Sequence, residues 1–277
     1  MHDIKKLEIK ACEMRKKVLD MCIKAGTGHV TSSFSCVEIL VALYHGKILN
    51  YKPDEPEWEK RDRFILSKGQ ASPILYAVLA DTGFFPIEWL DNFCKADGKF
   101  GVHLQHDIPG VEITAGSLGQ GFGIGVGMAL AAKQDKKDHM IFTLLGDGEC
   151  YEGSIWESAM FASHHKLDNL VAIVDRNGLC VMDFTEKIVK LEPLDKRWAS
   201  FGWDTAVIDG HSFKELFSVL SKVHKRANKT QKPLVIIANT IKGKGVCFME
   251  NKPLWHGVAP KGKEAELAIC ELLKKGT

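Results

Sequence analysis

Polar residues follow two strongly apolar segments of the chain, and their types suit a divalent metal ion. Gly146, Asp147 and Gly148 come directly after the apolar run that begins at residue 140, and Asn177 follows the run that begins at residue 170. Neighbouring parallel strands end at one edge of a sheet, where ligands commonly bind. Asp147 and Asn177 could meet there and, with a carbonyl and phosphate oxygens, form an octahedral Mg²⁺ shell. Two ordinary turns are the alternative, because Asp, Asn and Gly also favour turns.

A second stretch, residues 116–127, is rich in glycine. It contains no Gly-x-Gly-x-x-Gly fingerprint, and the chain has no Walker A sequence, so a dinucleotide site and a P-loop both lose their main support. The small residues predict a helix that packs closely on a neighbour. That neighbour could be a flat ligand or simply another helix, and the sequence does not decide between them.

Three histidines stand beside glycine in predicted loops: His29, His103 and His256. A sheet scaffold presents reactive groups on loops, and imidazole can exchange a proton near neutral pH. Single histidines are nevertheless more often solvated or structural. Lys242, in a glycine- and lysine-rich turn after the last apolar run, is a candidate for binding an anion, and Lys68 is a weaker one. A solvated loop explains both lysines equally well.

The apolar pattern also predicts the elements that position these groups. Apolar residues at spacings of three and four predict helices over residues 7–25, 37–43, 71–82, 119–132, 154–166, 213–228 and a last one after 263. Apolar runs predict strands at residues 63–67, 140–145, 170–174, 205–208 and 234–238. Continuous apolar strands separated by helices indicate a parallel sheet that is covered on both faces. We expect an α/β fold, a three-layer parallel sheet with helices on both faces, as one domain over residues 1–277.

The composition narrows the class of protein further. The chain has 277 residues, 45% of them hydrophobic, and its 37 Lys and Arg against 35 Asp and Glu give a net charge of +2. Such a balance gives no electrostatic support for a nucleic-acid or membrane partner. No apolar run is long enough for a transmembrane helix, and the N-terminus does not read as a secretory signal. We expect a cytoplasmic protein with eight reduced cysteines, none of them in a Cys-x-x-Cys zinc pair.

Taken together, the motifs resemble the N-terminal half of transketolase over nearly the whole chain. The matching segments are Gly28-His29, residues 61–70, 103–112 and 116–121, Gly146-Asp147-Gly148 with Asn177, and Trp255-His256-Gly257. The Gly-Asp-Gly motif with its Asn is shared by thiamine diphosphate enzymes generally, whereas the ordered histidines are specific to the transketolase-like branch. The resemblance implies the thiamine diphosphate-binding (PP) fold, in the N-terminal subunit of a two-subunit transketolase.

The resemblance also implies a role for individual residues. Mg²⁺, or Ca²⁺ or Mn²⁺ in its place, would be held by Asp147, Asn177 and the carbonyl of Leu179. Thiamine diphosphate would be bound by His29, Gly116, Ser117, Leu118, Gly146, Asp147, Gly148, Glu149, Asn177, Lys242 and His256. The catalytic residues would be His29, His103 and His256, which would bind the donor ketose and move protons.

The implied reaction moves a two-carbon glycolaldehyde unit from a ketose to an aldose acceptor, as in pentose phosphate metabolism. In the family a carboxylate of the pyrimidine-binding half activates the cofactor, and residues 258–277 are too few to supply that half. We therefore expect a C-terminal, pyrimidine-domain partner subunit, facing Glu152 and Glu157, in a heterotetramer built as a dimer of heterodimers.

One residue departs from the family pattern, because Gln70 stands where the family usually has histidine. Glutamine forms hydrogen bonds but does not titrate, which favours a transketolase specialised for an unusual sugar. The alternatives are a subunit of another thiamine diphosphate enzyme, of the 2-oxo acid dehydrogenase or deoxyxylulose-phosphate synthase type, and a non-catalytic homologue.

Overall fold

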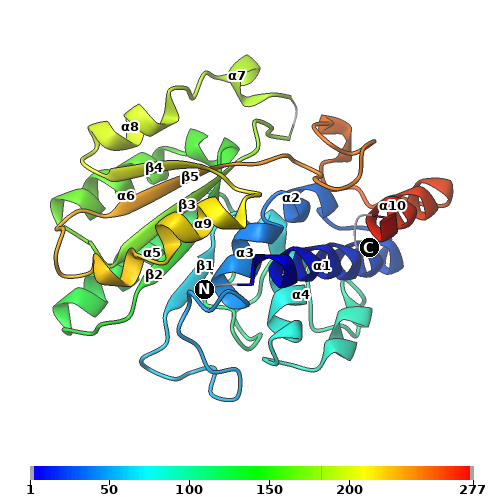
Figure 1. Ribbon diagram of the computed structural model, residues 1–277, viewed down its shortest axis with the longest axis horizontal. Coiled ribbons are helices and arrows are strands. Elements are labelled where there is room, and N and C mark those ends of the chain that lie inside the picture. Colours follow the sequence, from blue (N-terminus) through cyan, green and yellow to red (C-terminus); the bar gives the residue numbers. More distant parts are fainter. Residues whose placement is uncertain (1–2, 182, 275–277) are drawn as a thin grey trace.

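A five-stranded parallel sheet forms the centre of the computed structural model, which describes residues 3–181 and 183–274 (Figure 1). The strands lie in the order β1-β2-β3-β5-β4, and each neighbouring pair is parallel. Their bounds are β1 Arg63–Leu66, β2 Ile141–Gly146, β3 Leu170–Arg176, β4 Asp204–Asp209 and β5 Leu234–Asn239. Each strand lies within two residues of its predicted bounds.

Helices connect and cover these strands. The helices before β2 are α1 Ile4–Ala25, α2 Val30–Phe34, α3 Val37–Tyr44, α4 Ser72–Asp81 and α5 Gln120–Gln134. Those after β2 are α6 Gly153–His164, α7 Thr185–Ile188, α8 Leu194–Ser200, α9 Phe213–Leu220 and α10 Lys263–Lys274.

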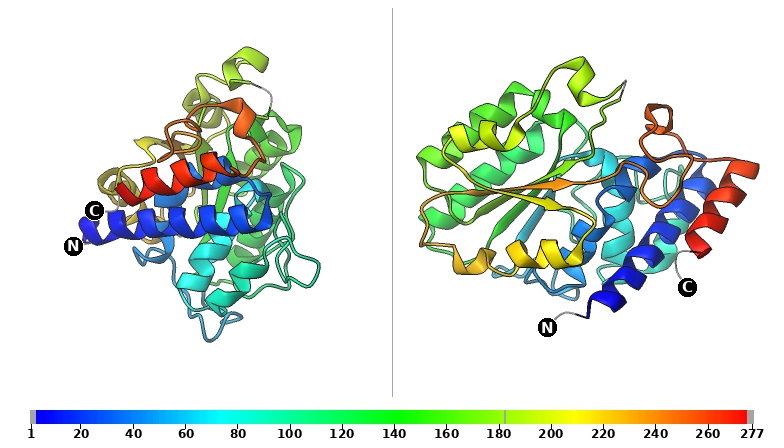
Figure 2. Two further views of the ribbon diagram at one scale, coloured as in Figure 1. Left: turned by 90° about the vertical axis from the view of Figure 1, so that its right-hand side faces the viewer. Right: turned by 45° about the horizontal axis from the view of Figure 1, so that its top comes forward.

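The sheet is packed on both faces, because successive strand residues point to opposite sides. Phe142 and Ile173 join a core with α1, α3, α4 and α9. Ile141 and Ala172, one residue away on the same strands, join a second core with α5, α6 and α8. Figure 2 shows the two helical layers on either side of the sheet. The predicted three-layer α/β fold is confirmed.

The first helix ends where the sequence predicted. Gly26 adopts the left-handed conformation at φ 70°, and its amide donates to the carbonyl of Ile23. Glycine adopts this conformation without steric cost, so it is the usual residue just beyond a helix end. Gly28 and His29 therefore lie in the short connection between α1 and α2, and His29 directly precedes α2.

The helix predicted over residues 213–228 was wrong in length. Helix α9 ends at Leu220, where the Ser221 hydroxyl donates to the carbonyl of Phe217 at 2.6 Å. A single 3-10 turn follows at Val223–Lys225. The apolar pattern stops after Val223, so a longer helix would have no apolar face to bury. His224 turns aside and lies 2.9 Å from the carboxylate of Asp62.

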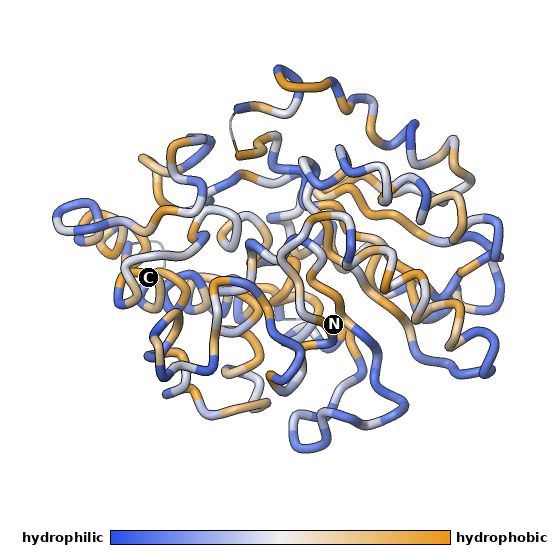
Figure 3. The backbone as a smooth tube through the Cα atoms, turned by 180° about the vertical axis from the view of Figure 1, so that it is seen from behind, coloured by the Kyte–Doolittle hydropathy of each residue, from blue (hydrophilic) through white to orange (hydrophobic). Residues whose placement is uncertain are grey.

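Helix α10 packs along α1, although the two lie at opposite ends of the sequence (Figures 1 and 2). Ala268 and Leu272 are buried there, and the Cys12 thiol donates to the carbonyl of Leu272 at 3.3 Å. Figure 3 shows apolar residues along the strands and hydrophilic residues along the outer connections. In the described part of the chain, no helix has both the length and the apolar character needed to cross a bilayer.

Candidate functional site

The carboxyl ends of four strands bring polar side chains to one edge of the sheet. Lys68 follows β1, Asp147 follows β2, Asn177 follows β3 and Lys242 follows β5. Strands β2 and β3 are neighbours, with Gly146 paired to Asp175, so Asp147 and Asn177 leave the sheet side by side. The edge is the one at which parallel sheets bind ligands.

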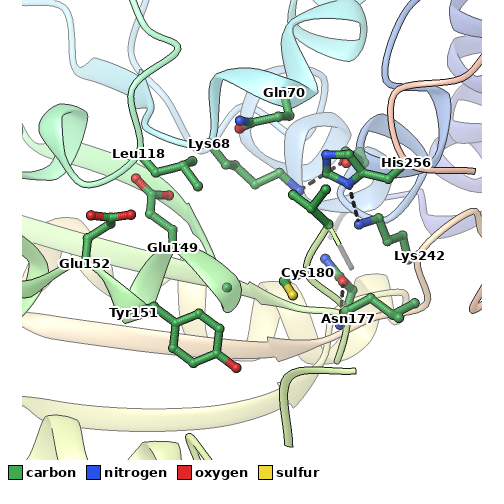
Figure 4. Close-up of a pocket in the computed structure, with 14 residues that line it drawn as sticks. Lys68, Gln70, Leu118, Glu149, Tyr151, Glu152, Asn177, Cys180, Lys242 and His256 are labelled. Carbon is green, nitrogen blue, oxygen red and sulfur yellow. Dashed lines mark hydrogen bonds between the residues drawn. The ribbon is translucent and has the colours of Figure 1, made fainter. Parts of the chain in front are cut away.

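A pocket of about 260 Å³ lies at this edge (Figure 4). It is lined by Ser32, Lys68, Gln70, Leu118, Gly148, Glu149, Tyr151, Glu152, Asn177, Leu179, Cys180, Val181, Lys242 and His256. In Figure 4, Lys68, Lys242 and His256 lie on one side and Leu118, Glu149 and Glu152 on the other. The pocket therefore has a basic wall opposite an acidic and apolar one.

Asp147 directly precedes Gly148 of the pocket lining and is itself 2% exposed. Its carboxylate accepts the amide of Gly148 at 2.8 Å and that of Gly178 at 2.6 Å. Burial, followed by the nearby charge of Asp175, raises the pKa of Asp147 to about 6. Burial thus makes the charged form of this carboxylate unfavourable, and a cation bound beside it would stabilise that form.

Asn177 is held so that its amide oxygen is fixed in place. The oxygen accepts the amide of Leu179 at 3.1 Å, and the amide nitrogen donates to Asp175 at 3.4 Å. A second lone pair of the oxygen remains for a ligand. Among the described residues, no group of three or more His, Cys, Asp and Glu side chains is arranged to hold a metal. A metal at Asp147 would therefore need amide, carbonyl and ligand oxygens, which Mg²⁺ and Ca²⁺ prefer.

A buried ion pair supports the floor of the pocket. The ammonium of Lys68 contacts the carboxylate of Asp175 and donates to the carbonyl of Ser32 at 3.0 Å. Burial acts to lower the pKa of Lys68, but the charge and hydrogen bond of Asp175, together with the charges of Cys36 and Asp147, outweigh it, so the pKa is raised. The Ser35 hydroxyl also donates to Asp175, at 2.6 Å. From the sequence, Lys68 was predicted only to bind an anion, and Asp175 was given no role. The one sequence signal for Asp175 is that a carboxylate stands at the end of an apolar strand.

Lys242 and His256 form a contact in the basic wall. The ammonium of Lys242 lies 2.9 Å from Nδ1 of His256, and Lys242 is 2% exposed. Burial, and then the charge of Lys68, lower the pKa of Lys242 to about 8. Asp175 already balances the charge of Lys68, so it is the buried ammonium of Lys242 that favours an anion here, such as a diphosphate.

Three histidines cluster beside the pocket. The ring of His29 stacks on that of His103 with centroids 5.6 Å apart, and meets that of His256 edge-on at 5.2 Å. Burial and nearby positive groups lower the pKa of His29 and of His256 to about 4, so both rings are neutral at pH 7. Nδ1 of His29 and Nδ1 of His103 are buried without a hydrogen-bond partner. Buried polar atoms are normally hydrogen-bonded, so these two unpaired nitrogens make the histidine cluster a candidate for contact with a ligand.

Glu149 ties the glycine-rich stretch to the end of β2. Its carboxylate accepts the amide of Gly119 at 2.9 Å and that of Gly146 at 3.1 Å. Gly119 has φ 81°, and a Cβ on it would lie 2.4 Å from the hydroxyl of Ser154. The predicted helix over 119–132 is α5, and the loop before it carries Leu118 into the pocket.

Some predicted site residues lie outside the pocket lining. The residues in question are His29, His103, Gly116, Ser117, Gly146 and Asp147. A Cβ on Gly116 would lie 3.3 Å from the ring of His103. Glu157 is exposed on α6, in a separate groove shared with α5 and lined also by Phe161. Gln70, in a 3-10 turn, and Glu152 do line the pocket.

Comparison with known proteins finds one family and several similar proteins, all of them transketolases. The family described as "Transketolase, thiamine diphosphate binding domain" matches residues 6–272. The chain is 43% identical over 271 residues to a 6-deoxy-6-sulfo-D-fructose transketolase subunit of Clostridium sp. strain MSTE9, covering 98% of this chain and 97% of the relative. It is 39% identical over 272 residues to an apulose-4-phosphate transketolase subunit of Phocaeicola vulgatus, covering 98% and 95%.

Longer relatives contain the chain as one part. Human transketolase is 39% identical over 263 residues, which are 95% of this chain but 41% of that protein. The crystal structure of transketolase from Campylobacter jejuni superposes with a TM-score of 0.90 at 32% identity, covering 98% of this chain and 43% of that one. The two relatives named as subunits thus match this chain over nearly their whole length, whereas the longer enzymes match it over about two-fifths of theirs.

Proposed function

The chain belongs to the transketolase family through its thiamine diphosphate-binding domain, and from this premise we propose that it is the cofactor-binding subunit of a two-subunit transketolase. Residues 1–277 would form one such domain. The observation that carries the proposal is the arrangement at the strand ends, where buried Asp147 and fixed Asn177 lie beside a pocket with two buried lysines and a histidine.

The residues present fit thiamine diphosphate with a divalent ion. Asp147, Asn177 and the carbonyl of Leu179 would hold Mg²⁺, or Ca²⁺ or Mn²⁺ in its place. Lys242 and the backbone of Gly148 would meet the diphosphate, and Leu118 would contact the ring system of the cofactor. The bound cofactor would supply the nucleophilic carbon that accepts a two-carbon unit.

The histidines would handle the sugar. Lys242 donates to Nδ1 of His256, so the proton of that ring sits on Nε2 and can be donated to a ketose oxygen. The ring of His29 packs against those of His103 and His256, so the three rings would bind neighbouring hydroxyls of the substrate. As a neutral imidazole, His29 can accept a proton when the carbon–carbon bond breaks and return it later.

A pyrimidine-domain partner subunit would complete the site. Glu152 lies at the pocket rim, and Ile124, Met160 and Phe161 expose 42%, 51% and 44% of their surface on α5 and α6, near Glu157. Exposed apolar side chains beside an open site are typical of a subunit interface. Two such pairs would form a dimer of heterodimers in the cytoplasm.

The donor sugar would be an unusual ketose. Two relatives that match in length carry names that refer to 6-deoxy-6-sulfo-D-fructose and apulose 4-phosphate, both of them ketoses with a distal anionic group. Gln70, rather than a titratable side chain, lines the pocket here. We therefore place the substrate among ketose phosphates or sulfonates, with an aldose acceptor.

The test is a transfer assay with both subunits. The chain would be produced with a candidate pyrimidine-domain subunit, and supplied with thiamine diphosphate, Mg²⁺ and a panel of ketoses. We expect two-carbon transfer to an aldose, and none by one subunit without the other or by Asp147→Ala. Decarboxylation of a 2-oxo acid instead would favour the dehydrogenase or synthase alternative. Absence of any cofactor binding by the assembled pair would favour the non-catalytic homologue.

A further inference from the structure

Three side chains outside the pocket, those of Arg15, Glu38 and His211, hold the turn that carries Lys242. Ile241 donates its amide to Nε2 of His211 at 2.9 Å, and the carbonyl of Lys244 accepts from Nε of Arg15 at 3.0 Å. Glu38 joins the two anchors, because its carboxylate binds both Arg15 and His211. The turn is therefore held on both sides of Lys242 by residues from α1, α3 and the loop after β4.

The register of the sheet explains why His211 reaches this turn. Asp209 at the end of β4 pairs with Asn239 at the end of β5, so His211 and Ile241 both lie two residues beyond a paired position. Gly210 between them permits the approach, since a Cβ there would lie 2.5 Å from the side chain of Thr240. The end of β4 thus brings His211 against the turn after β5, and His211 is not among the residues that line the pocket.

The hydrogen bonds fix the form of the His211 ring. A backbone amide can only donate, so Nε2 of His211 accepts and carries no proton. The proton therefore sits on Nδ1, which donates to Glu38 at 2.8 Å. Arg15 meets the same carboxylate through two nitrogens, at 2.7 and 2.8 Å, and also donates to the carbonyl of Phe34. Arg15, Glu38 and His211 are therefore joined to one another by hydrogen bonds, which makes this group of side chains rigid.

We propose that Arg15, Glu38 and His211 are positioning residues, which hold the turn at residues 241–244 so that the ammonium of Lys242 meets the pocket and Nδ1 of His256. None of the three lines the pocket. Arg15 and His211 hold the backbone of the turn, while the side chain of Lys242 contacts His256. The effect on thiamine diphosphate binding rests on the proposed function, whereas the hold on the turn does not.

Two substitutions of His211 separate its two nitrogens. In His211→Gln the side-chain amide reaches the place of Nε2 and can still accept from Ile241. In His211→Asn the shorter amide reaches only the place of Nδ1, so it keeps a donor for Glu38 and leaves Ile241 without an acceptor. The pair differ by one methylene and carry the same polar group, so each serves as the control for the other.

The first measurement follows hydrogen exchange of the Ile241 amide in the full chain without cofactor. We expect exchange about five- to tenfold faster in His211→Asn, the size of one lost hydrogen bond, and within about twofold of the original in His211→Gln. Exchange in β2 and β3 reports whether each variant is folded. Equal exchange of Ile241 in both variants and the original chain would overturn the proposal.

The second measurement is the affinity of the assembled subunits for thiamine diphosphate with Mg²⁺, by calorimetry. We expect His211→Asn to weaken cofactor binding about five- to tenfold. When Lys242→Met is already present, we expect it to weaken binding by less than about twofold more, because Arg15, Glu38 and His211 act through Lys242. An equal loss in both backgrounds would show general damage and overturn the positioning role. If the original complex does not bind the cofactor, the proposed function fails, and the exchange of Ile241 still decides whether the turn is held.

Discussion

Replacing Glu38 with glutamine is expected to destabilise the protein by an amount that the structure sets. Glu38 is 7% exposed, and its carboxylate is the partner of the buried guanidinium of Arg15. Burial acts to raise its pKa, but the charge of Arg15 and the hydrogen bond from His211 lower it from 4.5 to about 2. One pH unit corresponds to about 1.4 kcal/mol, so the charged form contributes about 3 kcal/mol to stability. The variant would leave Arg15 without its counter-charge and should lose about that much at neutral pH.

The pH dependence distinguishes this cause from a change in packing. A carboxyl with a lowered pKa stabilises the fold fully above its unfolded pKa, and the effect fades as the pH falls from 4.5 toward 2. Urea unfolding should therefore show a difference of about 3 kcal/mol between original and Glu38→Gln at about pH 7, and a clearly smaller one at about pH 3.5. Glu55→Gln is the control, because its bridge to Lys52 is exposed and is worth less than about 1 kcal/mol. A difference that stays constant over this range, or lies below about 1 kcal/mol at pH 7, would refute the reasoning.

Three further predictions concern the pocket. Gly119→Ala should lower the free energy of unfolding by about 1–3 kcal/mol and weaken cofactor binding, because φ is 81° and a Cβ would collide with the side chain of Ser154. The control is Gly127→Ala in α5, where a Cβ would have nothing within 4 Å and should stabilise the protein by up to about 1 kcal/mol. Equal effects of the two substitutions on thermal unfolding would contradict this prediction. The rings of His29 and His256, with pKa values lowered to about 4, should show no protonation by NMR between about pH 5.5 and 8, so a midpoint near 6.5 would be inconsistent with their burial. The pKa of Lys242 is lowered to about 8, so the free subunits lose its charge above that pH and their affinity for diphosphate should fall there; in Lys242→Met calorimetry should find this fall absent, and an unchanged fall would mean that another group causes it.

The sequence predicted the sheet and the elements around the pocket because buried parallel strands are continuous apolar runs. The five runs became β1 to β5, and the turn residues Asp147 and Asn177, which follow two of them, lie at the same edge of the sheet as the pocket. Helix ends with a local signal, such as Gly26, were also predictable. Helix α8 was missed because it is short and has Trp198 as its one large anchor in the core, without a repeating pattern.

Long-range pairs were out of reach of the sequence. Lys68 and Asp175 are 107 residues apart and meet only because β1, β2 and β3 lie side by side. Arg15 and Lys244 are 229 residues apart, and nothing local marks either as a partner of the other. Strand order decides such contacts, and the apolar pattern specifies which segments are strands but not how they are ordered.

The most direct test of the account is a calorimetric titration of thiamine diphosphate into the assembled subunits, with and without Mg²⁺. If Asp147 and Asn177 hold an ion that grips the diphosphate, binding should require the divalent ion, and Asp147→Asn should weaken it by about 100-fold or more. Binding of equal strength without any divalent ion, or unchanged binding by Asp147→Asn, would contradict the proposed role of this edge of the sheet.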